Sequence, residues 1–438
     1  MRRVLMVSPH FPPDATAASH RVLLLAPHLP RYGWEPTVVT VDPRDYEGRL
    51  DPELAELVPT GLRVVRCRAW SAQWTRRFGV GDLGLRAFSG LLRTCSHLLG
   101  GERFDALFIT IYPTYPALLG PLLKRRFGVP FVLDYQDPWV GSWGLTVGGG
   151  RNGAADWKSR LTRAVARRLE PVVTHAADAI TAVSVGTYEE IRARDDALGD
   201  KLWDAIPLGG EPADIEYLRA HPRPNRCFDW SDGRVHVCYV GTLLPAGIET
   251  LRAVLQAVAL LRNRRPELYR RLRFHFVGTS NQSAADAPQR VLPVAREMGV
   301  SDCVTEVASR IPYLDALTVQ CQASVILMMG SSEPHYTASK LYPALLAKRP
   351  LLAVYHEASS VVAALGRIVR PAVARVVTYN DTQRAAAQVE AIYGALSSLA
   401  ENPTYDASAV DLGAMTDWSA QRLAGKLAAI LDCVSAQS

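Results

Sequence analysis

Short runs of apolar residues recur along the chain, and they alternate with longer stretches in which apolar residues lie three or four positions apart. The runs predict buried strands, and the spaced stretches predict helices that pack on them. In the first half, the predicted strands are residues 3–8, 35–41, 62–67, 106–110, 131–134 and 179–183. In the second half, they are residues 235–241, 273–278, 323–329, 350–355 and 374–378. This alternation predicts βαβ units, and therefore a parallel sheet with right-handed crossovers in each half.

The helices have recognisable limits. Apolar residues recur at helical spacing from Val22 to Leu29, and Gly33 is a typical residue to end that helix. Further helical stretches cover residues 116–127 and 158–176. The pattern stops between residues 206 and 234, where turn-forming residues replace it. The sequence therefore predicts an α/β protein with a domain at 1–205, a linker at 206–234 and a domain at 235–412.

Length and composition agree with two domains. The chain has 438 residues and is 48% hydrophobic, and single cores stop growing at about 250–300 residues. Its 49 basic and 43 acidic residues give a net charge of +6, which is too small and too dispersed for a nucleic-acid coating. The seven cysteines have no CxxC spacing, so neither a disulfide framework nor a zinc site is indicated.

The sequence also bears on location. The apolar residues after Met1 are too few for a signal peptide, and no run reaches the roughly 18 to 20 apolar residues of a membrane span. We therefore expect a cytoplasmic protein, either soluble or peripheral on the inner membrane face.

One stretch carries the clearest chemistry. Residues 337–354 read TASKLYPALLAKRPLLAV and follow the strand at 323–329, so they predict a loop and then a helix with Ser339 as N-cap. Pro343 suits only the first turn of that helix. The free amides of a helix start, together with Lys340, would attract an anion such as phosphate. The bland alternative is a capped surface helix with a solvated lysine. We favour the anion site because the loop leaves the carboxyl end of a buried strand.

Five motifs, in order, resemble a known family: VLMVSPHFPPDATAASHRVLLLAPHL, GVPFVLDYQDPW, ADAITAVS, VCYVGT and SKLYPALLAKRPLLAV. Together they are similar to the bacterial glycosyltransferases of family four. The resemblance implies the GT-B fold, in which two doubly wound Rossmann-like domains face a cleft. It further implies a final helix, here within 413–438, that crosses back to the first domain.

The same resemblance assigns roles to residues. It implies a retaining transfer from a nucleotide-diphosphate sugar, without a metal or any other cofactor. The catalytic candidates are Asp137 and Lys340. The donor-binding candidates are Gly241, Thr242, Gly278, Glu333, Ser339, Lys340 and Leu341. The acceptor-side candidates are Asp14, Arg21, Tyr112 and Trp139, and Tyr115 is a further aromatic residue that would stack on a sugar or lipid. A turn-forming role for Asp137 is the alternative.

The chain departs from the family pattern in its donor site. Two glutamates of the family fall on His335 and Pro343 here, and the second of them binds the ribose hydroxyls. Glu333 is a nearby substitute. The basic pair that often follows the first strand of the second domain is replaced by neutral residues in Gly241–Gly247, which leaves Lys340 as a main cation, with Arg21 as a second one. Without the ribose carboxylate, a deoxythymidine-linked donor is a hypothesis, because its ribose lacks the 2′-hydroxyl.

The acceptor is open. A glycan, a lipid-linked or a small-molecule acceptor fits, in the synthesis of a cell-surface polysaccharide. Between residues 63 and 103, eight arginines lie among Trp70, Trp74, Phe78 and Phe88, a pattern that suits either docking on anionic lipid headgroups or a solvated face. Two other functions stay open: a partner of another transferase with a degenerate donor site, and a different GT-B enzyme such as a sugar-nucleotide epimerase.

Overall fold

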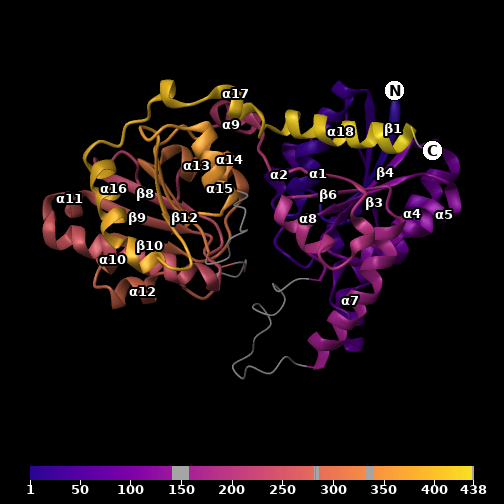
Figure 1. Cartoon of the computed structure of the whole chain (residues 1–438), viewed down its shortest axis with the longest axis horizontal. Helices are drawn as coiled ribbons and strands as arrows, with labels where there is room; N and C mark the ends of the chain where they lie inside the picture. Colours follow the sequence, from indigo (N-terminus) through magenta and orange to yellow (C-terminus); the bar gives the residue numbers. More distant parts are fainter. Residues whose placement is uncertain (141–156, 281, 283–285, 332–339, 437–438) are drawn as a thin grey trace. The chain divides into compact units, whose positions relative to one another are not determined.

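The computed structural model describes residues 1–140, 157–280, 282, 286–331 and 340–436. The chain divides into two compact units. Unit 1 consists of residues 1–208 and 420–438, and unit 2 of residues 209–419. Each is described separately below, and Figure 1 labels their elements.

Unit 1 contains a parallel sheet of seven strands among the described residues, in the order β3-β2-β1-β4-β5-β6-β7. The strands are β1 (Arg2–Val7), β2 (Trp34–Val41), β3 (Arg63–Cys67), β4 (Ala106–Ile111), β5 (Phe131–Tyr135), β6 (Ala179–Ala182) and β7 (Leu202–Ala205). The α-helices are α1 (Ser19–Leu25), α2 (Pro52–Glu56), α3 (Ala72–Thr75), α4 (Leu83–Gly101), α5 (Leu119–Phe127), α7 (Trp157–Ala176), α8 (Val185–Arg192) and α18 (Ala420–Ala436). The 3-10 helices include η1 (Ala26–Tyr32), η3 (Arg76–Phe78) and η4 (Tyr115–Leu118).

Unit 2 contains a parallel sheet of six strands among its described residues, in the order β10-β9-β8-β11-β12-β13. The strands are β8 (Val235–Val240), β9 (Leu272–Val277), β10 (Val304–Val307), β11 (Val325–Met329), β12 (Leu351–His356) and β13 (Ala374–Tyr379). The α-helices are α9 (Pro212–Ala220), α10 (Ile248–Arg264), α11 (Pro266–Arg271), α12 (Leu292–Glu297), α13 (Tyr313–Gln322), α14 (Leu341–Leu346), α15 (Ser360–Ile368), α16 (Val389–Glu401) and α17 (Leu412–Thr416).

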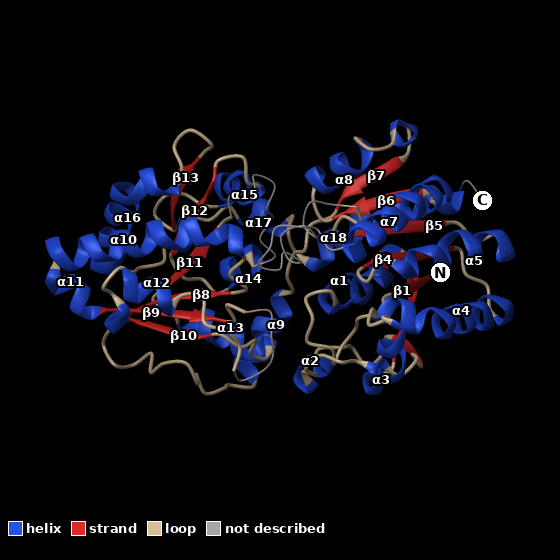
Figure 2. Ribbon diagram, turned by 90° about the horizontal axis from the view of Figure 1, so that it is seen from below, coloured by secondary structure: helices blue, strands red, loops and turns tan. Residues whose placement is uncertain are grey.

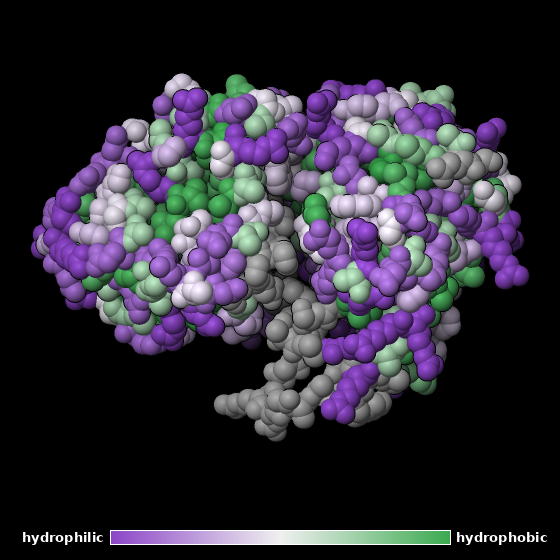
Figure 3. All heavy atoms as spheres, in the orientation of Figure 1, coloured by the Kyte–Doolittle hydropathy of each residue, from purple (hydrophilic) through white to green (hydrophobic). Residues whose placement is uncertain are grey.

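Helices cover both faces of each sheet, as the ribbon diagram shows (Figure 2). This arrangement explains the continuous apolar runs of the central strands, because both faces of such a strand are buried. In β8, Val237 joins the core beneath α10 and α16, while its neighbour Cys238 joins the core beneath α14 and α15. The predicted α/β class with two doubly wound sheets is confirmed. On the face seen in Figure 3, hydrophobic areas are set among hydrophilic side chains.

Two edge strands, β7 and β10, were not predicted from the sequence. β7 has the sequence LWDA and β10 has VTEV. Each has only four residues, and each contains an acidic residue, so neither forms an apolar run. The pairing partner, rather than an apolar run of its own, decides that such a segment is a strand.

The connections between the units also differ from the predicted boundaries. Residues 206–234 are not an unstructured linker, because α9 lies within them and its Asp214 accepts a hydrogen bond from Tyr313 of α13 at 2.8 Å. Residues 413–419 belong to unit 2, and the helix that returns to unit 1 begins at Ala420. This helix, α18, packs on α1 and η1, and its Asp432 accepts a 2.7 Å hydrogen bond from the buried Trp34 indole.

Candidate functional site

The carboxyl ends of the central strands of unit 1 meet at one edge of the sheet. Val7 at the end of β1 pairs with Ile109 of β4, which in turn pairs with Leu133 of β5. The loops after these strands therefore start side by side. The strand order changes direction between β1 and β4, and ligands of open α/β sheets bind at such switch points.

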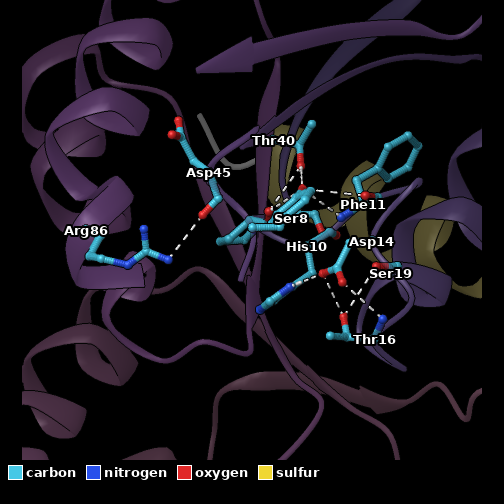
Figure 4. A network of polar contacts seen from close by, with 11 residues as sticks. Ser8, His10, Phe11, Asp14, Thr16, Ser19, Thr40, Asp45 and Arg86 are labelled. Atoms are coloured by element: carbon cyan, nitrogen blue, oxygen red, sulfur yellow. Dashed lines mark hydrogen bonds and ion pairs between the residues drawn. The ribbon is translucent and has the colours of Figure 1, made fainter. Parts of the chain in front are cut away.

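The loop after β1 is held by a network of side-chain hydrogen bonds (Figure 4). Asp14 is almost fully buried and accepts hydrogen bonds from the Thr16 amide at 3.2 Å and the Thr16 hydroxyl at 2.9 Å. Its carboxylate also binds Nδ1 of His10 in a very short contact. Asp14, which the resemblance placed on the acceptor side, thus acts by holding a histidine.

This pairing determines which ring nitrogen of His10 is available. An ionised carboxylate only accepts hydrogen bonds, as Asp14 does from Thr16, so the imidazole Nδ1 is the donor in the contact with His10. Nε2 is then the acceptor in the neutral ring, and it points away from Asp14 (Figure 4). A carboxylate that fixes the tautomer of an imidazole in this way makes Nε2 able to accept a proton or a hydrogen bond from a hydroxyl.

Aromatic rings and a second carboxyl group surround His10. Its ring is stacked on Tyr46 at 6.0 Å and lies 5.6 Å from the exposed ring of Tyr112, which follows β4. Asp82 caps the first turn of α4 by accepting from the Leu85 amide, and burial raises its pKa against the smaller lowering effects of the Leu85 and Gly84 amides and of His10. The acceptor-side candidates Asp14 and Tyr112 are therefore brought together around His10.

Asp137 follows β5 and stands two strands away from this loop in the sheet order. It is exposed, although desolvation raises its pKa to about 6. Beside it, the side-chain nitrogen of Gln136 is buried and has no hydrogen-bond partner among the described residues. Trp139 packs on the unit 1 core and meets the edge of Tyr115 at 6.1 Å. Asp137 thus lies at the predicted edge of the sheet, two residues before Trp139, which contacts Tyr115.

Arg21 has a different role from the predicted one. It is 1% exposed and binds both carboxylate oxygens of Asp134, at 2.8 and 2.6 Å. It also donates to the carbonyls of Ile206 and Pro207. These bonds join α1, β5 and the segment after β7 inside unit 1. Among the described residues, the hydrogen bonds of its guanidinium all go to groups of unit 1, which indicates a role in packing.

The sheet of unit 2 has its own switch point, between β8 and β11. Gly241 follows β8 with φ 148°, and Gly278 follows β9 with φ 73°, two conformations that favour glycine. Thr242, next to Gly241, is half-buried, and its carbonyl accepts a hydrogen bond from Tyr239 at 3.1 Å. These glycines leave the backbone at this edge open to a close approach by a ligand.

Lys340 lies at the same edge. A Cβ atom on Gly241 would be 3.8 Å from Cγ of Lys340, so the lysine side chain passes over the glycine. Lys340 is exposed, but desolvation and then the positive charge of Arg310 lower its pKa to about 8. Arg310 thus lies close enough to Lys340 for their charges to interact, and Lys340 passes over a glycine at the strand end, which is an arrangement suited to a diphosphate.

The helix after Lys340 differs from the prediction. α14 begins at Leu341, its N-cap is Lys340, and it has six residues, so it starts one position later than predicted and is short. Pro343 lies in the first turn, as predicted, while Leu341 is a buried core residue rather than a ligand contact. Ser339, Glu333 and His335 lie outside the described residues. In the predicted anion site, the positive charge therefore comes more from the Lys340 side chain than from the start of the short helix α14.

Two features of these sites escaped the sequence analysis. His10 is not among the predicted site residues, yet its spacing of four residues from Asp14, shortly after the first strand, is a usable signal. Arg310 had no such signal, because it follows the short strand β10, which was itself missed. The described residues contain no group of three histidine, cysteine, aspartate or glutamate residues arranged to hold a metal ion. None of the described helices is long and apolar enough to cross a membrane.

Comparison with known proteins places these sites in context. Residues 16–209 match the family model of the glycosyl transferase 4-like domain. No curated protein sequence matches the chain. Among solved structures, HepE from Anabaena in complex with UDP-glucose is similar over 100% of this chain and 99% of its own, with 13% identity and a TM-score of 0.56.

An α,α-trehalose-phosphate synthase (UDP-forming) from Burkholderia vietnamiensis is similar over the whole of both chains, with 13% identity and a TM-score of 0.60. The N-terminal domain of trehalose-6-phosphate phosphatase from Candida albicans covers 99% of this chain and 97% of its own, with the same identity and TM-score. At these identities the likeness concerns the fold. Over residues 16–209 the chain is thus similar to the glycosyl transferase 4-like domain, and with its two Rossmann-like units it has the GT-B fold.

Proposed function

We propose that this protein is a retaining glycosyltransferase that moves a sugar from a nucleotide-diphosphate donor to a glycan, a lipid-linked or a small-molecule acceptor in the synthesis of a cell-surface polysaccharide. The observation that carries the proposal is that the switch point of each sheet holds polar or charged side chains suited to a ligand. One presents cations over glycine, and the other presents a carboxylate-held imidazole. The matched family domain supports the same reaction class.

The donor diphosphate would bind unit 2. Lys340 and Arg310 would neutralise its charge, and the glycine at 241 would let the phosphates approach the backbone. As the sugar departs, negative charge grows on the leaving phosphate, so the same cations stabilise the transition state more than the ground state. The HepE structure contains UDP-glucose, which makes a nucleotide sugar the donor class to test first.

The acceptor would bind unit 1. Nε2 of His10 would accept a hydrogen bond from the acceptor hydroxyl, and Tyr112 would stack on the ring or chain that carries it. Asp137 would bind hydroxyl groups of the sugar or the acceptor. In a retaining transfer the leaving phosphate takes the acceptor proton, so the protein needs to position the hydroxyl rather than to remove its proton. We propose no metal and no other cofactor for this chemistry.

Product analysis tests the proposal. The purified protein is incubated with a panel of nucleotide sugars and with oligosaccharide and lipid-linked acceptors, and the anomeric configuration of the product is read by NMR. Transfer with retention supports the proposal. Inversion would contradict the retaining mechanism and would make His10 the base. An absence of both transfer and donor hydrolysis across the panel would contradict a transferase.

The second candidate is a donor-site-degenerate partner of another transferase. It is favoured by the buried Pro343, which stands where the family has the carboxylate that binds the ribose. Titration with nucleoside diphosphates separates the two functions. Saturable binding that Lys340→Ala abolishes would remove the premise of the partner model. A sugar-nucleotide epimerase would be revealed by an altered donor in the absence of any acceptor.

The partners that we propose are therefore a nucleotide-diphosphate sugar, the acceptor and an inner-membrane surface, without nucleic acid. A peripheral protein of the cytoplasmic membrane face would receive a lipid-linked acceptor directly. The surface that would make this contact is described next.

A further inference from the structure

Three aromatic side chains stand together on the surface of unit 1. Trp70, Trp74 and Phe78 are 50%, 48% and 69% exposed. The rings of the two tryptophans lie 5.3 Å apart, and the rings of Trp74 and Phe78 lie 5.1 Å apart. Single exposed apolar residues are ordinary, but adjacent ones form a patch, and patches mark binding surfaces. We call these three residues the aromatic ridge.

The aromatic ridge forms one wall of an apolar groove. The groove has a volume of about 430 Å³, and its lining residues are Trp70, Trp74, Thr75, Phe78, Val80, Leu85, Arg86, Phe88 and Ser89. Its other wall is the start of α4, which provides Leu85 and Phe88. The lining offers few hydrogen-bonding groups, so a sugar would lose its water without compensation there, whereas a hydrocarbon chain would lose nothing.

Hydrogen bonds hold the ridge against α4. The Trp70 indole donates to the Ser89 hydroxyl at 2.9 Å, and the Trp70 amide donates to the Arg86 carbonyl at 3.0 Å. The buried Arg86 guanidinium donates back to the Trp70 carbonyl at 2.8 Å. The Trp70 ring is therefore held by a fixed framework, and the Trp74 and Phe78 rings pack in series beside it. Presentation on a fixed framework lowers the entropic cost of binding a surface.

Positive charge borders the ridge. Arg76 and Arg77 directly precede Phe78, and both are exposed. Arg76 is paired with Glu47, while Arg77 has no ion pair among the described residues. Arg93, on the next turns of α4, is also exposed. The excess charge is modest, so we expect apolar insertion to dominate and charge to add a preference for anionic surfaces.

The groove lies close to the candidate acceptor site. Asp82, near His10, caps α4, and Leu85 in the same first turn lines the groove. Gly84 lies between them, and a Cβ atom there would be 2.8 Å from Pro113 in the loop that holds Tyr112. The first turn of α4 therefore connects the groove to the loop after β4.

We propose that this face of unit 1 docks on an anionic lipid bilayer, with Trp70, Trp74 and Phe78 at the headgroup level and one hydrocarbon chain in the groove. Tryptophan is enriched at that level because its ring is apolar and its N–H is polar. This proposal names the surface that would make the membrane contact of the proposed function. It rests on the proposed function only for the purpose of that contact, which is access to a lipid-linked acceptor. The docking itself concerns unit 1 alone.

Vesicle co-sedimentation tests the proposal with the full chain. We expect the protein to bind phosphatidylcholine vesicles that contain phosphatidylglycerol and to bind pure phosphatidylcholine vesicles less. The double variant Trp74→Glu with Phe78→Glu should bind at least ~10-fold more weakly, because each charge would have to enter the interface. The matched control is Trp230→Glu, which changes a 59% exposed tryptophan in unit 2 and should leave binding unchanged.

A second measurement keeps the outcome clear if the charged double variant unfolds. Tryptophan fluorescence is recorded with vesicles whose acyl chains carry bromine, and Trp74→Phe should remove part of the quenching at unchanged binding. The proposal is overturned if the wild type ignores anionic vesicles, or if the ridge variants bind as well as the Trp230 control. It is also overturned if sedimentation shows a dimer that the ridge variants dissociate while no vesicle binding occurs, because the patch would then be covered by a second copy.

The nucleotide titration separates this result from the proposed function. Nucleoside diphosphate binding by unit 2 should be the same in the wild type and in the ridge variants. A protein that binds nucleotide but no vesicles would contradict the docking and leave the transferase intact. A protein that binds vesicles but no nucleotide would support the docking and contradict the transferase.

Discussion

The two switch points of the molecule share a topology and differ in chemistry. In unit 1, the loop after the first strand is filled by side chains that bond to one another, with Asp14 and His10 at the centre. In unit 2, the loop after the first strand begins with Gly241, and the nearest side chain is the long stem of Lys340. One edge is built from polar side chains, and the other from bare backbone and cations.

This difference corresponds to two kinds of ligand. A hydroxyl group is recognised by an acceptor atom in a fixed position, which a carboxylate-held imidazole provides. A diphosphate is recognised by charge and by close approach to the backbone, which lysine, arginine and glycine provide. The two units thus share one fold but carry different chemistry at equivalent strand ends: a hydrogen-bond acceptor in unit 1, and cations beside glycine in unit 2. The predictions below test that contrast, from the largest effect to the smallest.

The largest effect is expected from a polar cluster of unit 1 that has no ligand role. Arg21→Met leaves the buried Asp134 carboxylate without its cationic partner, with only the Thr181 hydroxyl still donating to it, and we expect unit 1 to lose about 3–5 kcal/mol of its free energy of unfolding. Denaturant unfolding measures this loss. Nucleoside diphosphate affinity should not change in the variant that remains folded.

The control for Arg21 is an ion pair near the surface, between Arg63 and Glu102. Arg63→Met breaks the bidentate contact with Glu102, and we expect a loss below about 1 kcal/mol because both groups remain in water. Equal losses in the two variants would contradict an internal role for Arg21. A selective loss of diphosphate affinity in Arg21→Met would restore the ligand role that the sequence suggested.

Lys340 is expected to dominate unit 2. Lys340→Ala removes the cation that passes over Gly241, and we expect transfer to fall about 10²- to 10³-fold, as for other groups that stabilise charge in a transition state. Diphosphate affinity, measured by calorimetry, should fall as well. Lys426→Ala is the matched control, since this lysine of α18 is 47% exposed and lies in unit 1. A loss of the same size in both variants would remove Lys340 from the donor site.

The sequence predicted the parts of this contrast that depend on a pattern. The central strands were found because a strand that is buried on both faces is apolar throughout, and their order along the chain then placed Gly241 and Lys340 at one edge. The edge strands β7 and β10 were missed because neither strand is an apolar run. Arg310 was missed with β10, since a residue after an unrecognised strand has no predicted position.

The roles of Arg21 and His10 could not be read in the same way. Both lie near the first strand and both carry the same kinds of atoms that a ligand would bind. Arg21 is used internally because Asp134, far along the chain, is brought beside it by the pairing of β4 and β5. His10 is oriented by a carboxylate only four positions away. Such assignments depend on side-chain partners, which periodicity does not contain.

His10 gives the next prediction. His10→Ala should lower the transfer rate by roughly 10²-fold, because the acceptor hydroxyl loses the hydrogen bond that positions it while the contact with Tyr112 remains. Nucleoside diphosphate affinity should be unchanged, which distinguishes this variant from Lys340→Ala. His97→Ala on the exposed side of α4 is the control. A fall in diphosphate affinity on loss of His10 would break the proposed division of labour.

The nucleoside part of the donor offers a smaller effect. Pro343 is buried where the family carboxylate binds the ribose hydroxyls, so little is gained from a 2′-hydroxyl. We expect the protein to bind thymidine diphosphate at least as well as uridine diphosphate, with an advantage of no more than about tenfold. Competition titration measures this ratio. A clear preference for uridine or guanosine diphosphate would show that another residue replaces the missing carboxylate.

The smallest effect is a pH dependence of the cationic edge. Desolvation and Arg310 lower the pKa of Lys340 to about 8, so its charge is complete below that pH and is lost as the pH rises through it. Diphosphate affinity should therefore decline between pH 8 and the ordinary pKa of lysine, by up to about tenfold for the loss of one partly screened charge. Lys340→Arg keeps its charge at these pH values and should flatten the decline, because guanidinium does not lose its proton in this range. If the wild type and the arginine variant declined together, the titrating group would lie elsewhere, and the contrast between a hydrogen-bond-accepting edge in unit 1 and a cationic edge in unit 2 would need another explanation.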